Sequence, residues 1–181
     1  ILRSKTYMAD RIVGFFSERA YIRDYPTGPL AASLIGIIND NGVGASGIEA
    51  SMNSELSGVN GSYDYSNGAG TIIPGSQQFI TEAKSGEGIQ LTVDRDVQWV
   101  AQSAISAAVK KTGADSGTVI VMNPKTGAIL AQASAPTFDP ANRKTITNAS
   151  MRNPAVQDTY EPGSTGKLIT ISAALELKRT T

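Results

Sequence analysis

The sequence predicts an α+β fold, in which helices and antiparallel strands follow one another along 181 residues. Three observations carry this prediction. Residues 94–111 place apolar side chains at helical spacing. Residues 117–134 read as two strands joined by a turn, and residues 57–88 contain a second hairpin pattern. A chain of this length forms one domain or two small ones.

The first third of the chain reads as helices separated by turns. A helix with a serine cap is expected over residues 4–20, and the Pro- and Gly-containing segment 25–29 ends it. A short apolar segment, residues 30–38, and a Gly- and Asn-rich loop, residues 39–46, come next. Residues 48–56 predict one further helix with a structural role.

Residues 57–88 are rich in glycine, serine and asparagine, and two interpretations are open. Tyr63 and Tyr65 alternate with polar residues, an Asn-Gly turn signal follows at 67–68, and residues 71–73 are strand-like. These features favour a hairpin that helps to join two modules. A flexible linker is the alternative, and the aromatic and β-branched residues argue against it.

Residues 89–93 read as a strand, and Asp94 then caps a helix that runs through Lys111. Trp99 is expected in or beside the core. The predicted apolar stripe of this helix comprises Val97, Val100, Ala104, Ile105 and Ala108.

The hairpin after this helix has strands near 117–122 and 128–134. Residues 135–160 contain three prolines and little periodicity. Two interpretations are open for Arg152 and Asn153 within them: they line a site, or they lie at the surface, and the surface role is the one expected. A last helix starts after the Pro-Gly turn at 162–163. This helix is expected to bury one face, which comprises Leu168, Ile171 and Leu175, with Ile169 and Ala174 beside them.

The start of the last helix carries the residues with the clearest chemistry. Ser164 and Lys167 are three residues apart, so a helix places them on one face, one turn apart. The chain has no histidine, which excludes a Ser-His-Asp triad within it, and a lysine one turn away is an alternative base. The N-terminus of a helix also favours negative charge that develops beside Ser164.

The Ser-x-x-Lys spacing by itself is a weak signal. About one such match is expected by chance in a chain of this composition. An ordinary helix with a serine cap and an exposed lysine is the simpler explanation of those four residues alone. The surrounding sequence therefore decides between the two interpretations.

That surrounding sequence resembles the class B penicillin-binding proteins, the peptidoglycan D,D-transpeptidases of bacterial division and elongation. YEPGSTGKLIT at 160–170 resembles the family's nucleophile segment, and NPAVQD at 153–158 resembles its lead-in. The resemblance continues in the family's order over most of the chain. The other segments that carry it are YPTGPLAA at 25–32, GIE at 47–49, LTVD at 91–94, GTVIVMNPKTGAILA at 117–131 and PTFDP at 136–140.

The resemblance implies two domains. Residues 1–87 would form a mixed pedestal module, and residues 88–181 would form the N-terminal part of a transpeptidase domain, which is serine β-lactamase-like. Ser164 would be the nucleophile acylated by D-Ala-D-Ala stem peptides and by β-lactam antibiotics, with Lys167 taking its proton. The backbone N–H of Ser164 would donate to the oxyanion. Gly166 departs from the family, where a bulkier or polar residue is commoner.

Two family motifs that follow the nucleophile, S-x-N and K-[ST]-G, do not occur between it and Thr181. Three look-alikes elsewhere have local explanations. SMN at 51–53 lies in a helical run, KTG at 111–113 reads as a helix C-terminus, and KTG at 125–127 is a hairpin tip. The isolated chain is therefore expected to be inactive. Its unfinished sheet edge is expected to favour association with a missing C-terminal part, a second chain or another copy.

The composition excludes several other classes of function. Sixteen basic and sixteen acidic side chains are intermixed and give zero net charge, so nucleic acid is not an expected partner. Without cysteine or histidine, disulfides, a zinc site and a cofactor held by such residues are not expected. No apolar run approaches the roughly 20 residues that a transmembrane helix needs.

The resemblance also implies a location and partners. It implies an anchor helix upstream of residue 1, a place on the extracytoplasmic face of the cell membrane, and contacts with membrane proteins of division or elongation. Two alternatives to a transpeptidase stay open. One is a β-lactamase or β-lactam sensor, against which the pedestal-like residues 1–87 speak. The other is a non-catalytic binding module of the cell-wall machinery.

Overall fold

Helices and short antiparallel strands alternate along the chain, which confirms the predicted α+β class. The structure, a computed structural model, describes residues 3–4, 21–68 and 71–179. The predicted helix over residues 4–20 lies outside the described residues except for its first position. That position belongs to strand β1, Arg3–Ser4, which pairs with β2, Tyr21–Ile22.

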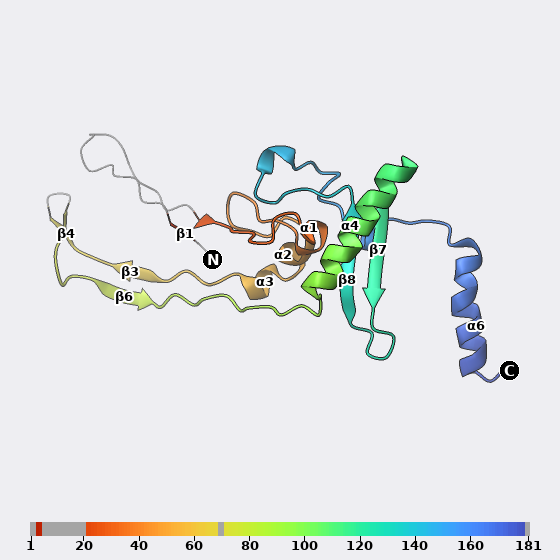
Figure 1. Ribbon diagram of the computed structural model, residues 1–181. Helices are drawn as coiled ribbons and strands as arrows, with labels where there is room; N and C mark the ends of the chain where they lie inside the picture. The colour runs from red at the N-terminus through yellow and green to blue at the C-terminus, as the bar shows by residue number, and fades with distance from the viewer. Residues whose placement is uncertain (1–2, 5–20, 69–70, 180–181) are drawn as a thin grey trace.

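A helix packed on a two-stranded sheet forms the core of the second half (Figure 1). Helix α4, Arg95–Thr112, lies against strands β7, Gly117–Met122, and β8, Ile129–Ala135. The strands pair antiparallel, as predicted, and their small inward side chains let the helix approach closely. The core comprises Ala101, Ala131 and Ala133, with Val97, Ile105, Val119 and Val121 packed against them.

Both ends of α4 follow signals in the sequence. The Asp94 carboxylate accepts hydrogen bonds from the N–H groups of Asp96, at 2.9 Å, and Val97, at 3.0 Å. Gly113 ends the helix in the left-handed region, with φ of 70°, where a side chain would be unfavourable. The prediction of a capped helix from Asp94 to about Lys111 is confirmed.

The buried face of α4 differs from the predicted one. Val97, Ala101 and Ile105 face the sheet, so the contacts repeat every four residues. This repeat turns Trp99 and Val100 outward, and they are 63% and 59% exposed. The placement of Trp99 in or beside the core was therefore wrong.

Gln98, next to this buried face, closes the outer edge of β8. The side chain is 1% exposed. Its NH₂ donates to the Gln132 carbonyl at 3.0 Å, and its carbonyl accepts from the Gln132 N–H at 2.8 Å. One side-chain amide thus takes the place that a peptide group of a neighbouring strand would hold. The strand predicted at residues 89–93 does not form, and that segment is irregular.

Three short helices form a second compact unit. They are α1, Ala32–Ile35, α2, Gly47–Ser51, and α3, Asn53–Leu56. The single helix predicted over residues 48–56 is interrupted at Met52, which lies between α2 and α3. Glycine permits the close packing of this unit. A Cβ on Gly36, where φ is 82°, would lie 1.8 Å from a backbone oxygen.

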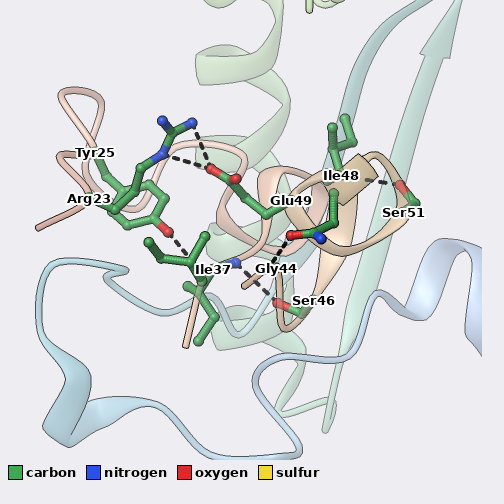
Figure 2. A network of polar contacts seen from close by, with 10 residues as sticks. Arg23, Tyr25, Ile37, Gly44, Ser46, Ile48, Glu49 and Ser51 are labelled. Atoms are coloured by element: carbon green, nitrogen blue, oxygen red, sulfur yellow. Dashed lines mark hydrogen bonds and ion pairs between the residues drawn. The ribbon is translucent and has the colours of Figure 1, made fainter. Parts of the chain in front are cut away.

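An ion pair and a tyrosine fix the start of this unit against α2 (Figure 2). The Arg23 guanidinium contacts one carboxylate oxygen of Glu49 at 2.8 and 2.9 Å, and Glu49 is 5% exposed. The Tyr25 hydroxyl accepts a hydrogen bond from the Ile38 N–H at 3.1 Å. Burial raises the pKa of Tyr25 above its ordinary value, and the hydrogen bond from Ile38 opposes this rise.

Residues 57–68 and 71–88 form a long hairpin arm that projects away from the rest of the molecule (Figure 1). Strand β3, Ser62–Asp64, pairs with β6, Gln78–Thr81. Nearer the tip, β4, Asn67–Gly68, pairs with β5, Thr71–Ile72. The hairpin interpretation is therefore confirmed over that of a flexible linker.

Side chains join the helical unit to the helix-and-sheet unit. The Gln102 NH₂ of α4 donates to the Pro29 carbonyl at 2.9 Å, and its oxygen accepts from the Ala31 N–H at 2.9 Å. Arg143, in the 3₁₀ turn η1, Arg143–Thr145, forms an ion pair with Asp40. The boundary expected between the two domains, at residues 87 and 88, lies in a segment without helix or strand. The contacts of Gln102 and Arg143 connect the parts of the chain before and after it.

After β8 the chain runs through helix α5, Pro154–Gln157, and ends in helix α6, Lys167–Glu176. Helix α5 packs against β7 and β8. Helix α6 stands apart from the sheet (Figure 1), and of the described elements it packs only against the 3₁₀ turn before it. No helix in the described part of the chain is both long and apolar enough to cross a membrane.

Candidate active site

Ser164 and Lys167 lie at the junction between a turn and a helix. Ser164 belongs to the 3₁₀ turn η2, Gly163–Gly166, and Lys167 is the first residue of α6. Pro162 precedes the turn, and Gly163, with φ of 54°, supplies the left-handed backbone that the bend requires. Because a 3₁₀ turn has about three residues per turn, residues three apart lie on the same side of it.

The side chains of Ser164 and Lys167 are both accessible to solvent. Both are exposed, and the described residues place no hydrogen bond between them. A serine hydroxyl beside an amine can act as a nucleophile with a base once the two groups touch. The Ser164 carbonyl accepts the N–H of Lys167, which fixes the two backbones relative to each other.

The face of α6 that the sequence predicts to be buried is exposed. Leu168, Ile171 and Leu175 are 72%, 54% and 53% exposed, and Ile169 is 77% exposed. The helix itself forms where it was expected, but the prediction that its face is buried was wrong. The physical reason is that no described helix or strand reaches α6.

The segment that leads to Ser164 is held more firmly than its sequence suggested. Asn153 was expected at the surface, yet it is 8% exposed and accepts a hydrogen bond from the Gln132 NH₂ at 2.9 Å. Arg152 is exposed and forms an ion pair with Asp158, on the other side of α5. The expectation for Asn153 is therefore wrong, and that for Arg152 is confirmed.

Neither Gln98 nor Gln132 was singled out by the sequence, although both are buried and paired. One signal was available. Gln98 lies beside the apolar stripe of a helix, and Gln132 lies in the middle of an apolar strand. A buried amide at such a place needs hydrogen-bond partners, so each glutamine indicates a specific contact.

The two KTG look-alikes occupy the local positions that were predicted for them, whereas SMN does not lie within one continuous helix. Residues 51–53 span the break between α2 and α3. Residues 111–113 contain the end of α4, and residues 125–127 form the tip of the β7–β8 hairpin, where Asn123 accepts from the N–H groups of two turn residues.

A hollow of about 680 Å³ lies between α2 and α5 and does not include Ser164 or Lys167. Among the described residues, no group of three or more acidic side chains could hold a metal ion.

The sequence from β7 onward matches a known family. Residues 117–181 match the family described as "Penicillin binding protein transpeptidase domain". "Penicillin-binding protein PbpB" of Mycolicibacterium smegmatis is 37% identical over 171 residues, which are 93% of this chain and 26% of that protein. "Probable peptidoglycan D,D-transpeptidase PbpC" of Pseudomonas aeruginosa is 38% identical over 175 residues, which are 96% of this chain and 31% of that protein.

Solved structures show the same fold. The crystal structure of penicillin binding protein 3 from Mycobacterium tuberculosis, complexed with aztreonam, superposes with a TM-score of 0.75. It is 30% identical to this chain, and the match covers 100% of this chain and 35% of that one.

The fold and these matches define a penicillin-binding protein with the start of a transpeptidase domain. The chain belongs to the class B penicillin-binding proteins, as the resemblance of its motifs predicted. It spans between 26% and 31% of the length of the two curated relatives described above.

Proposed function

We propose that this chain is the nucleophile-bearing part of a peptidoglycan D,D-transpeptidase. Residues 1–87 act as its pedestal, and residues 88–181 begin its catalytic domain. One observation carries the proposal: Ser164 and Lys167 lie on one side of a turn that starts a helix, inside the segment that matches the transpeptidase family. With no histidine in the chain, Lys167 is the base within reach along the helix.

In this reaction the Ser164 hydroxyl oxygen attacks the carbonyl carbon of the D-Ala-D-Ala amide while Lys167 accepts its proton. The amide C–N bond breaks, the terminal D-Ala leaves as the protonated amine, and the stem peptide stays on Ser164 as an ester. The amine of a second stem peptide then attacks the ester, which forms the cross-link and frees the serine. A β-lactam ring opens on the same oxygen, and its ester persists.

The proposal extends to the place and the partners of the whole protein. It acts on the extracytoplasmic face of the cell membrane, held by an anchor upstream of residue 1, beside membrane proteins of division or elongation. Membership of a family whose relatives include a peptidoglycan D,D-transpeptidase named FtsI supports this part of the proposal.

The test is covalent labelling of the full-length protein by a fluorescent penicillin. The wild-type protein should form a stable adduct, and Ser164→Ala should form none. Ser172→Ala is the matched control, since this serine is exposed and lies on α6, the helix that follows Ser164. Equal labelling of Ser164→Ala and the wild type would contradict the assignment of the nucleophile.

Two other results point to the alternative functions. Rapid hydrolysis of the adduct, with turnover of the penicillin, would indicate a β-lactamase. A full-length protein that folds but takes no label would indicate a non-catalytic binding module.

A further inference from the structure

A chain of three buried amides connects α4, β8 and α5. Gln98, Gln132 and Asn153 are 1%, 8% and 8% exposed. The Gln98 side chain makes two hydrogen bonds with the Gln132 backbone, at 3.0 and 2.8 Å, and the Gln132 NH₂ donates to the Asn153 side-chain oxygen at 2.9 Å. Segments 34 and 21 residues apart in the sequence are thereby linked.

The last member of this chain is fixed by its main chain as well. The Asn153 N–H donates to the side-chain oxygen of Gln157 at 2.6 Å, and its carbonyl accepts from the N–H groups of Val156 and Gln157. Asn153 is therefore held both to the sheet and to α5. A buried amide left without its partner is costly, so this geometry resists displacement.

The anchored segment is the last fixed point before the proposed nucleophile. The ion pair between Arg152 and Asp158 closes the chain around α5. Between Asp158 and Pro162, the intervening residues make no hydrogen bond to other described residues. Ser164 follows at once, in a turn that packs on α6 alone among the described elements. Along the chain, Asn153 is therefore the last buried residue that is hydrogen-bonded to the sheet before Ser164.

We infer that Asn153 is a positioning residue for the acylation of Ser164, and that it acts through its hydrogen bond from Gln132. The inference rests on the proposed function. Asn153 does not touch the reacting atoms. It fixes the start of the short segment that leads to Ser164. A displacement of that segment would move the Ser164 hydroxyl out of line with the carbonyl carbon that it attacks. Misplacement of a reacting group by about 1 Å can cost about a hundredfold in rate.

The experiment compares acylation rates of the full-length protein and its variants with a fluorescent penicillin. Asn153→Leu keeps the size of the side chain and removes the acceptor, whereas Asn153→Asp keeps an acceptor oxygen. Gln132→Met removes the donor and leaves the backbone bonds of Gln132 to Gln98. Asn148→Leu is the matched control, since Asn148 is an exposed asparagine outside the amide chain.

Two measured quantities distinguish a positioning role of Asn153 from an effect on the amount of folded protein. The amplitude of labelling at saturation counts the folded sites, and the rate per labelled site reports on geometry. We expect Asn153→Leu and Gln132→Met each to slow acylation per site about 10- to 100-fold, with little change in the pre-covalent dissociation constant. Asn153→Asp should restore most of the rate, and Asn148→Leu should match the wild type.

A double substitution tests the link itself. If the hydrogen bond carries the effect, Asn153→Leu combined with Gln132→Met should be no slower than either alone. Should Asn153→Leu yield no folded protein, Gln132→Met decides the question by itself.

Three results would overturn the inference: wild-type rates per site with reduced amplitude in Asn153→Leu, a wild-type rate per site in Gln132→Met, or fully additive losses in the double variant. Failure of the wild-type protein to label is a different result, which contradicts the proposed function.

Discussion

Ser164, in the 3₁₀ turn, and Lys167, at the start of α6, lie on one side because they are three residues apart, and Pro162 and Gly163 form the bend that precedes them. This arrangement depends on neighbouring residues alone, so the sequence was sufficient to predict it. The roles of nucleophile and base stay a prediction. They rest on the family match over residues 117–181 and on the absence of histidine from the chain.

Lys167→Ala in the full-length protein should slow acylation by penicillin about 10²- to 10⁴-fold, because the serine then loses its general base. The labelling amplitude after long incubation should stay close to that of the wild type. Lys125→Ala is the control, since this exposed lysine lies at the hairpin tip. An unchanged rate in Lys167→Ala would remove this lysine from the mechanism.

Arg23→Ala should loosen the helical unit, because it leaves the carboxylate of Glu49 buried without its cation. Local opening should become easier by about 2 kcal/mol, or about thirtyfold faster amide exchange in the segment 37–49. Hydrogen exchange of the full-length protein, read by mass spectrometry, measures this.

The second substitution in that test is Glu49→Gln, which removes the buried charge. Combined with Arg23→Ala, Glu49→Gln should restore part of the protection of segment 37–49 against amide hydrogen exchange. Arg95→Ala, at an exposed arginine of α4, should leave the segment unchanged. Equal exchange in Arg23→Ala and the wild type would show that the ion pair contributes nothing measurable.

The hydrogen bonds that link Gln98, Gln132 and Asn153 could not be predicted from the sequence. Their partners lie 34 and 21 residues away in the sequence. Only the packing of α4 and α5 against β8 brings these residues together, and no local pattern encodes that packing. Asn153 was accordingly expected at the surface although it is buried.

At the scale of elements, the structures fixed by local chemistry were predicted well. Asp94 and Gly113 delimit α4, and the turn residues between β7 and β8 define their hairpin. The elements that depend on distant partners were predicted less well. The predicted strand at 89–93 does not form, although Thr92 and Asp94 at the end of this segment donate to the carbonyls of Ile129 and Leu130 in β8.

Helix α6 leads to a prediction of its own. Its exposed apolar side chains should cause the chain of residues 1–181, produced alone, to self-associate. Ile171→Lys with Leu175→Lys should shift the protein toward the monomer in sedimentation velocity. Ser172→Lys, on the same helix, is the control for added charge. A wild-type chain that stays monomeric with rising concentration would contradict this.

At the scale of the whole molecule, the chain matches 26% and 31% of the length of two longer relatives, and residues 117–181 match the transpeptidase domain family. The arm, the helical unit and the helix-and-sheet unit follow one another in Figure 1, and Gln102 and Arg143 connect the last two. The order of these units could be predicted from the family's motifs. The side-chain contacts between them could not, because they join residues that are far apart in the sequence.

The chain of residues 1–181, taken alone, should form no adduct with a fluorescent penicillin, while the full-length protein does. The reason is that S-x-N and K-[ST]-G are absent between Ser164 and Thr181, and groups that act together in a site are far from additive. The two proteins are compared by gel fluorescence after equal incubation. An adduct on Ser164 of the shorter chain would show that these motifs are dispensable for acylation.

The side-chain amide of Gln98 affects which edge of the β7–β8 sheet can pair with a further strand. It occupies the outward groups of Gln132, so no strand can be added beside β8 there. On the opposite side, the outward backbone groups of Thr118 and Ile120 in β7 have no hydrogen-bond partner among the described residues. A further strand can pair only at an edge of the sheet whose backbone N–H and C=O groups are free. Further strands of this sheet should therefore pair beside β7, because the edge of β8 is already occupied by the Gln98 side chain and by the Asp94 N–H, which donates to the Leu130 carbonyl at 2.9 Å.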